Sequence, residues 1–115
     1  MHEMGIALQI MEIARSSLPT GSEDVRIEKV NLKIGKLAAV VPSSLRFCFE
    51  VVSKDTPFAG STLDIKEVPV VVKCRSCRNE WTVIGPDFRC KTCPDGEVDI
   101  VTGREIEIIS LEVAE

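Results

Sequence analysis

Cys74-Arg-Ser-Cys77 and Cys90-Lys-Thr-Cys93 are two CxxC pairs in the second half of the chain. Within each pair the spacing allows a tight turn to direct both sulfur atoms toward one ion. Residues 78–89, which separate the pairs, have about the length of a short hairpin that would return the second pair to the first. Four thiolates in a tetrahedron are the donor set that Zn²⁺ prefers in a closed structural site. The stretch therefore predicts that Cys74, Cys77, Cys90 and Cys93 bind one zinc ion.

Three other interpretations of the two pairs are two disulfides, a redox-active CxxC, and iron in the same cage. Either disulfide interpretation leaves the symmetry of the pairs unexplained. The first residues also carry early glutamates and no basic segment, so we expect no signal peptide and no oxidising compartment. Iron stays open, because thiolate ligands alone do not separate it from zinc. A closed four-sulfur site has no open position for a catalytic water, so we expect the metal to hold a lobe together.

The amino-acid composition argues against some classes of function. The chain has 115 residues, 44% of them hydrophobic, and a formal net charge of −4. This apolar content suffices for a folded core, whereas a weakly acidic chain with one Trp and no Tyr is a poor candidate for binding nucleic acid. No apolar run reaches the roughly 18 residues that a membrane span needs. We therefore expect a cytoplasmic protein with reduced cysteines and with neither nucleic acid nor membrane as a partner.

Catalytic constellations are not evident in the sequence. Glu3, Glu12 and Glu50 are scattered carboxylates of the kind that more often lie on solvated helix faces. We find no nucleophile paired with a general base and no phosphate-binding glycine loop. The sequence therefore does not predict an enzyme.

Apolar periodicity predicts an α+β fold. Helical spacing over residues 3–17 groups Met4, Ala7, Leu8 and Met11 with Ile6, Ile10 and Ile13 into one wide buried face. The apolar residues of the first strand change from odd to even positions near Glu28, which suggests a bulge there. The apolar residues of the last strand also change between even and odd positions midway. Serine is expected as N-cap of the second helix. The predicted elements are a helix over 3–17, a strand over 25–35, a helix from Pro42 to about Ser53, a strand over 63–68 and a last strand over 106–113.

The order of these elements predicts how the chain is divided. The last strand has to return to the sheet begun by the first two, so the stretch with the cysteines is an insertion between strands. We expect two helices on a small three-stranded sheet, formed by residues 1–69 and 104–115. Residues 70–103 then form a zinc-ribbon-like lobe. Cys48 falls at helical spacing with Leu45, Phe49 and Val52, which predicts a small buried hydrophobe rather than a reactive thiol.

His2 is the only histidine in the chain and stands next to the α-amine of Met1. A lone histidine is most often a surface side chain, but this position suits chelation. The α-amine and the amide and imidazole nitrogens of His2 can close fused small rings around one cation, and a fourth nitrogen, such as the backbone amide of Glu3, can complete a plane. A planar set of nitrogens favours Ni²⁺ or Cu²⁺. The amine has to be deprotonated for binding, so affinity should fall as the pH is lowered.

The chain resembles the HypA/HybF family of hydrogenase nickel-incorporation proteins over essentially its whole length. The resemblance is carried by Met1-His-Glu-Met4, Ile34-Gly-Lys-Leu37, Leu45-Arg-Phe47 with Phe49-Glu50, and the two CxxC pairs, in one unbroken order.

This resemblance implies a nickel metallochaperone that delivers Ni²⁺ to the large-subunit precursor of a nickel–iron hydrogenase, together with a nickel-handling GTPase. It also implies that His2, beside Glu3, is a nickel ligand and that the four cysteines of the CxxC pairs bind zinc. Some members of the family carry histidines near the zinc lobe, whereas this chain has none there.

The alternative function is a zinc-ribbon adaptor that binds protein or nucleic acid without nickel transfer. Residues 74–93 contain four basic and two acidic side chains. The excess of two positive charges would be cancelled by four thiolates around Zn²⁺. A lobe without a net positive field attracts phosphates poorly, which disfavours the nucleic-acid form of this alternative.

Overall fold

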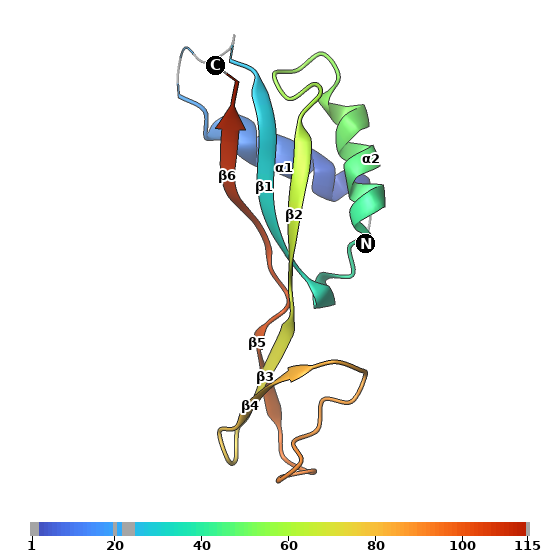
Figure 1. Ribbon diagram of the computed structural model, residues 1–115, viewed down its shortest axis with the longest axis vertical. Helices are drawn as coiled ribbons and strands as arrows, with labels where there is room; N and C mark the ends of the chain where they lie inside the picture. Colours follow the sequence, from blue (N-terminus) through green and yellow to red (C-terminus); the bar gives the residue numbers. More distant parts are fainter. Residues whose placement is uncertain (1–2, 20, 22–24, 115) are drawn as a thin grey trace.

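The protein is elongated and contains two three-stranded sheets. Its structure is a computed structural model that describes residues 3–19, 21 and 25–114, with extents of 57 × 25 × 19 Å. The two sheets lie one beyond the other along the long axis (Figure 1). The elements are α1 (Glu3–Ser16), β1 (Ile27–Gly35), the short helix η1 (Lys36–Ala38), α2 (Pro42–Ser53), β2 (Thr62–Val68), β3 (Val70–Cys74), β4 (Glu80–Val83), β5 (Val98–Thr102) and β6 (Ile106–Val113). No helix in the described part of the chain has the length and hydrophobicity needed to cross a membrane.

The first sheet has the strand order β2-β1-β6, with β1 parallel to β2 and antiparallel to β6. Along β1, Val30, Leu32 and Ile34 are buried and the residues between them are more exposed, which confirms the predicted alternation. The register between β1 and β6 shifts at Glu28 and again at Ile109. At each shift one strand carries an extra residue, so the parity changes in the sequence mark two bulges.

Helix α1 packs on the sheet face that carries Val30, Leu32 and Ile34. The wide buried face predicted for this helix is only partly correct. Met4, Leu8 and Ile13 are 39%, 52% and 60% exposed, because three strands and one neighbouring helix cover only part of the circumference of α1. The residues of α1 that are buried are Ile6, Ala7, Ile10, Met11 and Ala14.

Helix α2 packs against α1 and contributes Leu45 and Phe49 to the same core. The ring of Phe49 meets that of Phe58 edge to face, with 6.2 Å between their centroids. Cys48 packs against the core, as predicted, but it is half-buried rather than buried. The prediction of a serine N-cap is wrong. Val41 occupies that position without a side-chain cap, because Pro42 has a fixed φ that suits the first turn and is itself the first helical residue, ahead of both serines.

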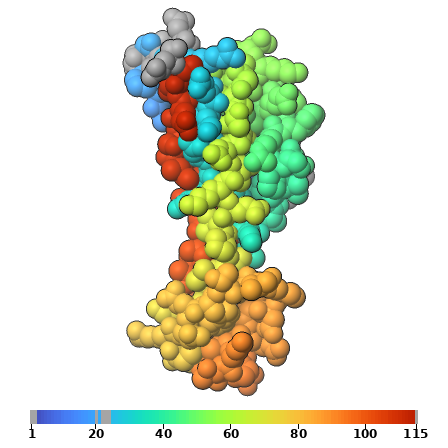
Figure 2. All heavy atoms as spheres, in the orientation of Figure 1, coloured from blue at the N-terminus to red at the C-terminus, as the bar shows by residue number. Residues whose placement is uncertain are grey.

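The second sheet has the strand order β4-β3-β5, and both strand pairs are antiparallel. It is inserted between β2 and β6. The chain enters it through Pro69 and leaves it through residues 103–105. Figure 2 shows this orange lobe joined to the rest of the molecule by a narrower region. The α+β fold with an inserted lobe is thus confirmed, while the domain limits at residues 69/70 and 103/104 stay a prediction.

The chain crosses closely on itself where the two sheets meet. The backbone N–H of Gly35 donates to the carbonyl oxygen of Glu105 at 2.7 Å, and that of Leu37 donates to the carbonyl oxygen of Gly103 at 2.7 Å. A β-carbon built on Gly35 would lie 2.0 Å from the carbonyl carbon and oxygen of Gly103. Only a glycine at position 35 allows the two segments to approach this closely.

Candidate metal centre

The two CxxC pairs meet at one point in the lobe. The sulfur atoms of Cys74, Cys77, Cys90 and Cys93 all lie within 4.8 Å of one another, and those of Cys77 and Cys90 are 3.6 Å apart. Four thiolates at about 2.3 Å from a tetrahedral zinc ion would be about 3.8 Å apart, so the cluster has the dimensions of that site. Cys74 and Cys90 are buried and Cys77 is exposed. The donor set fits zinc, and the cluster could hold a structural zinc ion.

The first pair occupies the turn between β3 and β4. The Cys74 N–H donates to the carbonyl oxygen of Asn79, and the Arg78 N–H donates to the carbonyl oxygen of Cys74, both at 2.9 Å. Arg78 has a φ of 63°, in the left-handed region, which lets the chain reverse directly after Cys77. The prediction of a separate hairpin between the two pairs is wrong. Residues 78–89 contain only β4, which pairs with β3, so the hairpin encloses the first pair.

The second pair is brought to the first by strand β5. Gly96 donates its N–H to the carbonyl oxygen of Cys93 at 2.9 Å, closing a turn after the pair. A β-carbon on Gly96 would lie 3.1 Å from that of Cys93, so the turn leaves little room for a side chain. Strand β5 then pairs with β3, and Val98 lies opposite Cys74. The β3–β5 ladder therefore fixes the distance between the two turns that carry the thiols.

The thiols of the cluster differ in acidity. A hydrogen bond from the backbone of Cys77 lowers the pKa of Cys74 to about 7. Burial raises the pKa of Cys93 to about 12. Cysteines bind metals as thiolates, so the low pKa of Cys74 favours its metal-binding form.

The predicted nickel ligands are only partly within the described chain. Met1 and His2 lie outside the described residues. Glu3 is the first residue of α1 and is half-buried, and its Oε2 accepts a hydrogen bond of 3.4 Å from the backbone N–H of Val41. Val41 is the N-cap of α2, where a carboxylate is favourable. The N–H of the first helical residue has no acceptor within its own helix, so the Glu3 amide is not committed to the hydrogen bonds of α1.

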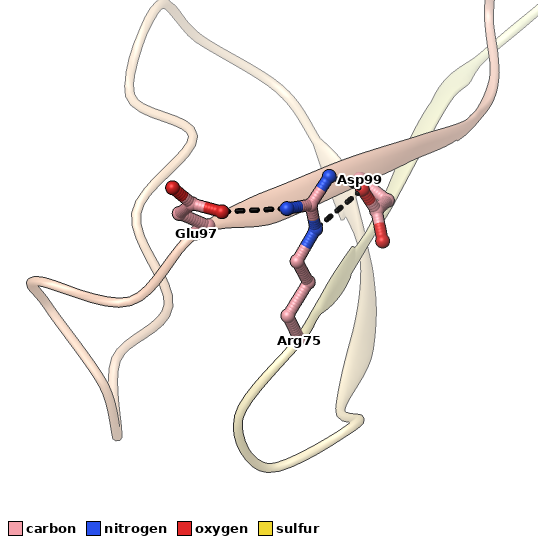
Figure 3. Close-up of polar contacts among 3 residues, drawn as sticks. All are labelled: Arg75, Glu97 and Asp99. Atoms are coloured by element: carbon pink, nitrogen blue, oxygen red, sulfur yellow. Dashed lines mark hydrogen bonds and ion pairs between the residues drawn. The ribbon is translucent and has the colours of Figure 1, made fainter.

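Three side chains near the cysteines were not predicted from the sequence. Arg75, inside the first CxxC pair, forms ion pairs with Glu97 and Asp99, which both follow the second pair (Figure 3). The two acids are two residues apart, a spacing that directs side chains to one side of a strand. That spacing is the signal that could have indicated them, had strand β5 been predicted.

Known proteins match this chain along its whole length. Residues 1–113 match the family described as "Hydrogenase/urease nickel incorporation, metallochaperone, hypA". A hydrogenase maturation factor HypA from Desulfosudis oleivorans is 56% identical over 115 residues, covering 100% of both chains. One from Desulfatibacillum aliphaticivorans is 52% identical over 115 residues, covering 100% of this chain and 88% of the relative. The solution structure of the nickel metallochaperone HypA from Helicobacter pylori has a TM-score of 0.69, at 24% identity and 97% coverage of both chains, which supports the fold.

An α+β protein with an inserted four-cysteine lobe and this whole-length similarity is, by class, a nickel-incorporation metallochaperone. The family match also confirms the resemblance found in the sequence motifs. The chain belongs to the HypA family. The alternative of a zinc-ribbon adaptor without nickel transfer is not favoured.

Proposed function

We propose that this chain binds Ni²⁺ as cargo through the α-amine of Met1 and the nitrogens of His2, and releases it to the large-subunit precursor of a nickel–iron hydrogenase. The transfer takes place in the cytoplasm with a nickel-handling GTPase, and the chain acts as a carrier rather than an enzyme. The observation that carries the proposal is the match to a nickel-incorporation family over residues 1–113, which include Met1, His2 and Glu3. The relatives' name, hydrogenase maturation factor, supports hydrogenase rather than urease as the recipient.

We further propose that the four clustered cysteines hold a permanent zinc ion with a structural role. A four-thiolate site is closed, so neither exchange of a ligand nor catalysis is expected there. Cargo needs the opposite property, because it has to be handed over. Nitrogen donors that precede α1 can release an ion without unpacking the core, whose first member along the chain is Ile6.

The decisive substitution for the nickel site is His2→Ala. It removes one ring-closing nitrogen, and we expect the nickel affinity to fall by about 100-fold or more, since even residues that only orient metal ligands are worth about 10- to 100-fold. Nickel titration by calorimetry, on protein whose first residue is Met1, measures the change. Glu12→Ala, which removes an exposed carboxylate on α1, is the matched control and should leave the affinity unchanged. Equal affinity of His2→Ala and the native sequence would remove the site assignment.

A pair of substitutions at Glu3 tests whether its backbone amide is the fourth nitrogen. Both Glu3→Ala and Glu3→Pro lose the hydrogen bond to Val41, but only Glu3→Pro loses the amide proton. Proline is tolerated in the first turn of a helix, so α1 should form in both. We expect Glu3→Pro to bind nickel more weakly than Glu3→Ala in the same titration. Equal binding by the two variants would show that another donor completes the plane.

A further inference from the structure

The guanidinium of Arg75 lies between two carboxylates. Its Nη1 is 2.6 Å from Oε2 of Glu97, and its Nε and Nη2 are 2.8 Å and 2.7 Å from Oδ1 of Asp99 (Figure 3). The backbone N–H of Arg75 also donates to the carbonyl oxygen of Glu97 at 2.9 Å. Arg75 is thus bound to Glu97 through both its backbone and its side chain, and to Asp99 through one edge of its planar group.

These contacts connect the two halves of the cysteine cluster. Arg75 lies within the first pair, between Cys74 and Cys77, whereas Glu97 and Asp99 belong to the segment that leaves the second pair. Hydrogen bonding from Arg75 lowers the pKa of Asp99 below its ordinary value, which favours the charged carboxylate. The ion pairs therefore hold the turn with the first two thiols against the strand that follows the other two.

A second arginine in the lobe has a similar setting but cannot make such a connection. Arg89 directly precedes Cys90 and forms an ion pair of 3.0 Å with Asp87. Its side chain is 73% exposed, compared with 58% for Arg75. Because Asp87 is only two residues away, this pair lies within one segment and does not join the two turns. Arg89 is therefore a matched control for a charged neighbour of a cysteine ligand.

We propose that Arg75 is a positioning residue of the four-cysteine site, whose ion pairs with Glu97 and Asp99 slow the release of the bound zinc ion. This inference rests on the proposed zinc site. For zinc to leave, thiolates have to detach one after another, and the turn of the first pair has to move away from that of the second. The bridge by Arg75 opposes that movement. It does not touch the metal, so the number of zinc ions bound per chain is expected to stay the same.

The size of the effect follows from the exposure of the three side chains. Each ion pair is accessible to water, and exposed pairs are weak and screened by salt. Loss of the bridge should therefore speed release by about fivefold in dilute buffer. Near 1 M NaCl, where the Debye length is only about 3 Å, the difference should almost vanish. A residue that acted through packing alone would not give this salt dependence.

The test is the rate of zinc transfer from the full chain to an excess of a chromogenic chelator. We expect Arg75→Ala to release zinc about fivefold faster than the native protein. Arg75→Lys, which keeps the positive charge but lacks the planar guanidinium with its several N–H donors, should be intermediate. The double variant Glu97→Gln/Asp99→Asn removes the same ion pairs from the acidic side and should match Arg75→Ala. Arg89→Ala should release zinc at the native rate.

Two outcomes overturn the inference. If Arg75→Ala and the double variant both release zinc at the native rate, or if Arg89→Ala accelerates release equally, Arg75 does not position the site. If Arg75→Ala fails to fold, the double variant alone decides between these results. Zinc content is measured first, so that failure of this inference about Arg75 can be distinguished from failure of the proposed function. A native protein without zinc would remove the zinc site itself, whereas one zinc ion with unchanged release rates would remove only the role of Arg75.

Discussion

Cys74→Ala is expected to abolish zinc binding and to unfold the second sheet, while the two helices and the first sheet stay folded. Cys74 is fully buried at the end of β3 and is one of four clustered thiols. Three remaining thiolates leave an open position, which weakens a structural site that binds four. Folding of small metal-stapled lobes is coupled to metal binding, so loss of the ion should become loss of the lobe.

The reason is that the lobe has little apolar core of its own. Among its described residues, the buried hydrophobic side chains besides Cys74 and Cys90 are Val70 and Val72. Burying a valine contributes about 1.5–3 kcal/mol, whereas ordering each residue of backbone costs about 1–2 kcal/mol. The burial of two valines cannot offset the free-energy cost of ordering the backbone of residues 70–103. The helix-and-sheet part, in contrast, has a contiguous core drawn from α1, β1, α2 and β2.

Zinc content and far-UV circular dichroism check this prediction together. Cys74→Ala should carry no zinc and lose the strand signal of the lobe, with the helical minimum retained. Cys48→Ala is the matched control, because it removes the one cysteine outside the cluster and should keep its zinc. Collapse of the helical signal along with the lobe would contradict the predicted division between residues 1–69 with 104–115 and residues 70–103.

Gly35→Ala is expected to destabilise the protein by about 3 kcal/mol, which for a chain of this size lowers the melting temperature by about 10 °C. The backbone of Gly35 has φ −72° and ψ 147°, an extended conformation that alanine adopts freely. The free-energy cost of the substitution is therefore purely steric. The added β-carbon would lie 2.0 Å from the carbonyl group of Gly103 and 2.6 Å from the backbone nitrogen of Arg104, and backbone atoms cannot turn aside as a flexible side chain does.

Gly5→Ala is the comparison variant, and we expect it to change the stability in the opposite direction. Gly5 lies in α1, and an added β-carbon there would meet nothing within 4 Å. Alanine is favoured over glycine in helices by about 0.5–1 kcal/mol, so this variant should be slightly more stable than the native protein. Thermal unfolding followed by the helical signal compares the two. A melting temperature for Gly35→Ala at or above the native value would show that the crossing between the sheets is not as tight as described.

The first half of the fold could be predicted because its elements carry their own periodicity. Helices α1 and α2 and strands β1 and β2 begin and end within two residues of the predicted bounds. The break in the alternation of apolar and polar residues along β1 also predicted the bulge at Glu28. The side chains of α1 that proved exposed were not predictable in the same way, because periodicity identifies an apolar face but not how much of it neighbours cover.

The second sheet could be predicted only as a lobe. Strands β4 and β5 have 4 and 5 residues, too few for a clear alternation, and their pairing with β3 depends on contacts between distant segments. The cysteine spacing nevertheless predicted which four thiols would meet, because ligand geometry is set within each CxxC pair.

Contacts between remote residues account for what the sequence did not indicate. Arg75 reaches Asp99 across the β3–β5 pairing, and Gly35 meets Gly103 where the two sheets join. Neither contact leaves a local pattern. An arginine within a CxxC pair and a glycine that ends a strand each have many explanations until the partner segment is known.

In the proposed function, sulfur holds one metal permanently while nitrogen at Met1 and His2 carries another. Metal content of protein beginning at Met1, exposed to nickel and zinc and then freed of unbound ions, tests it most directly. We expect one zinc and one nickel ion per chain, with a single added glycine before Met1 abolishing the nickel but not the zinc. A protein with an intact first residue that retains zinc alone, or one that keeps its nickel despite the added glycine, would contradict the account.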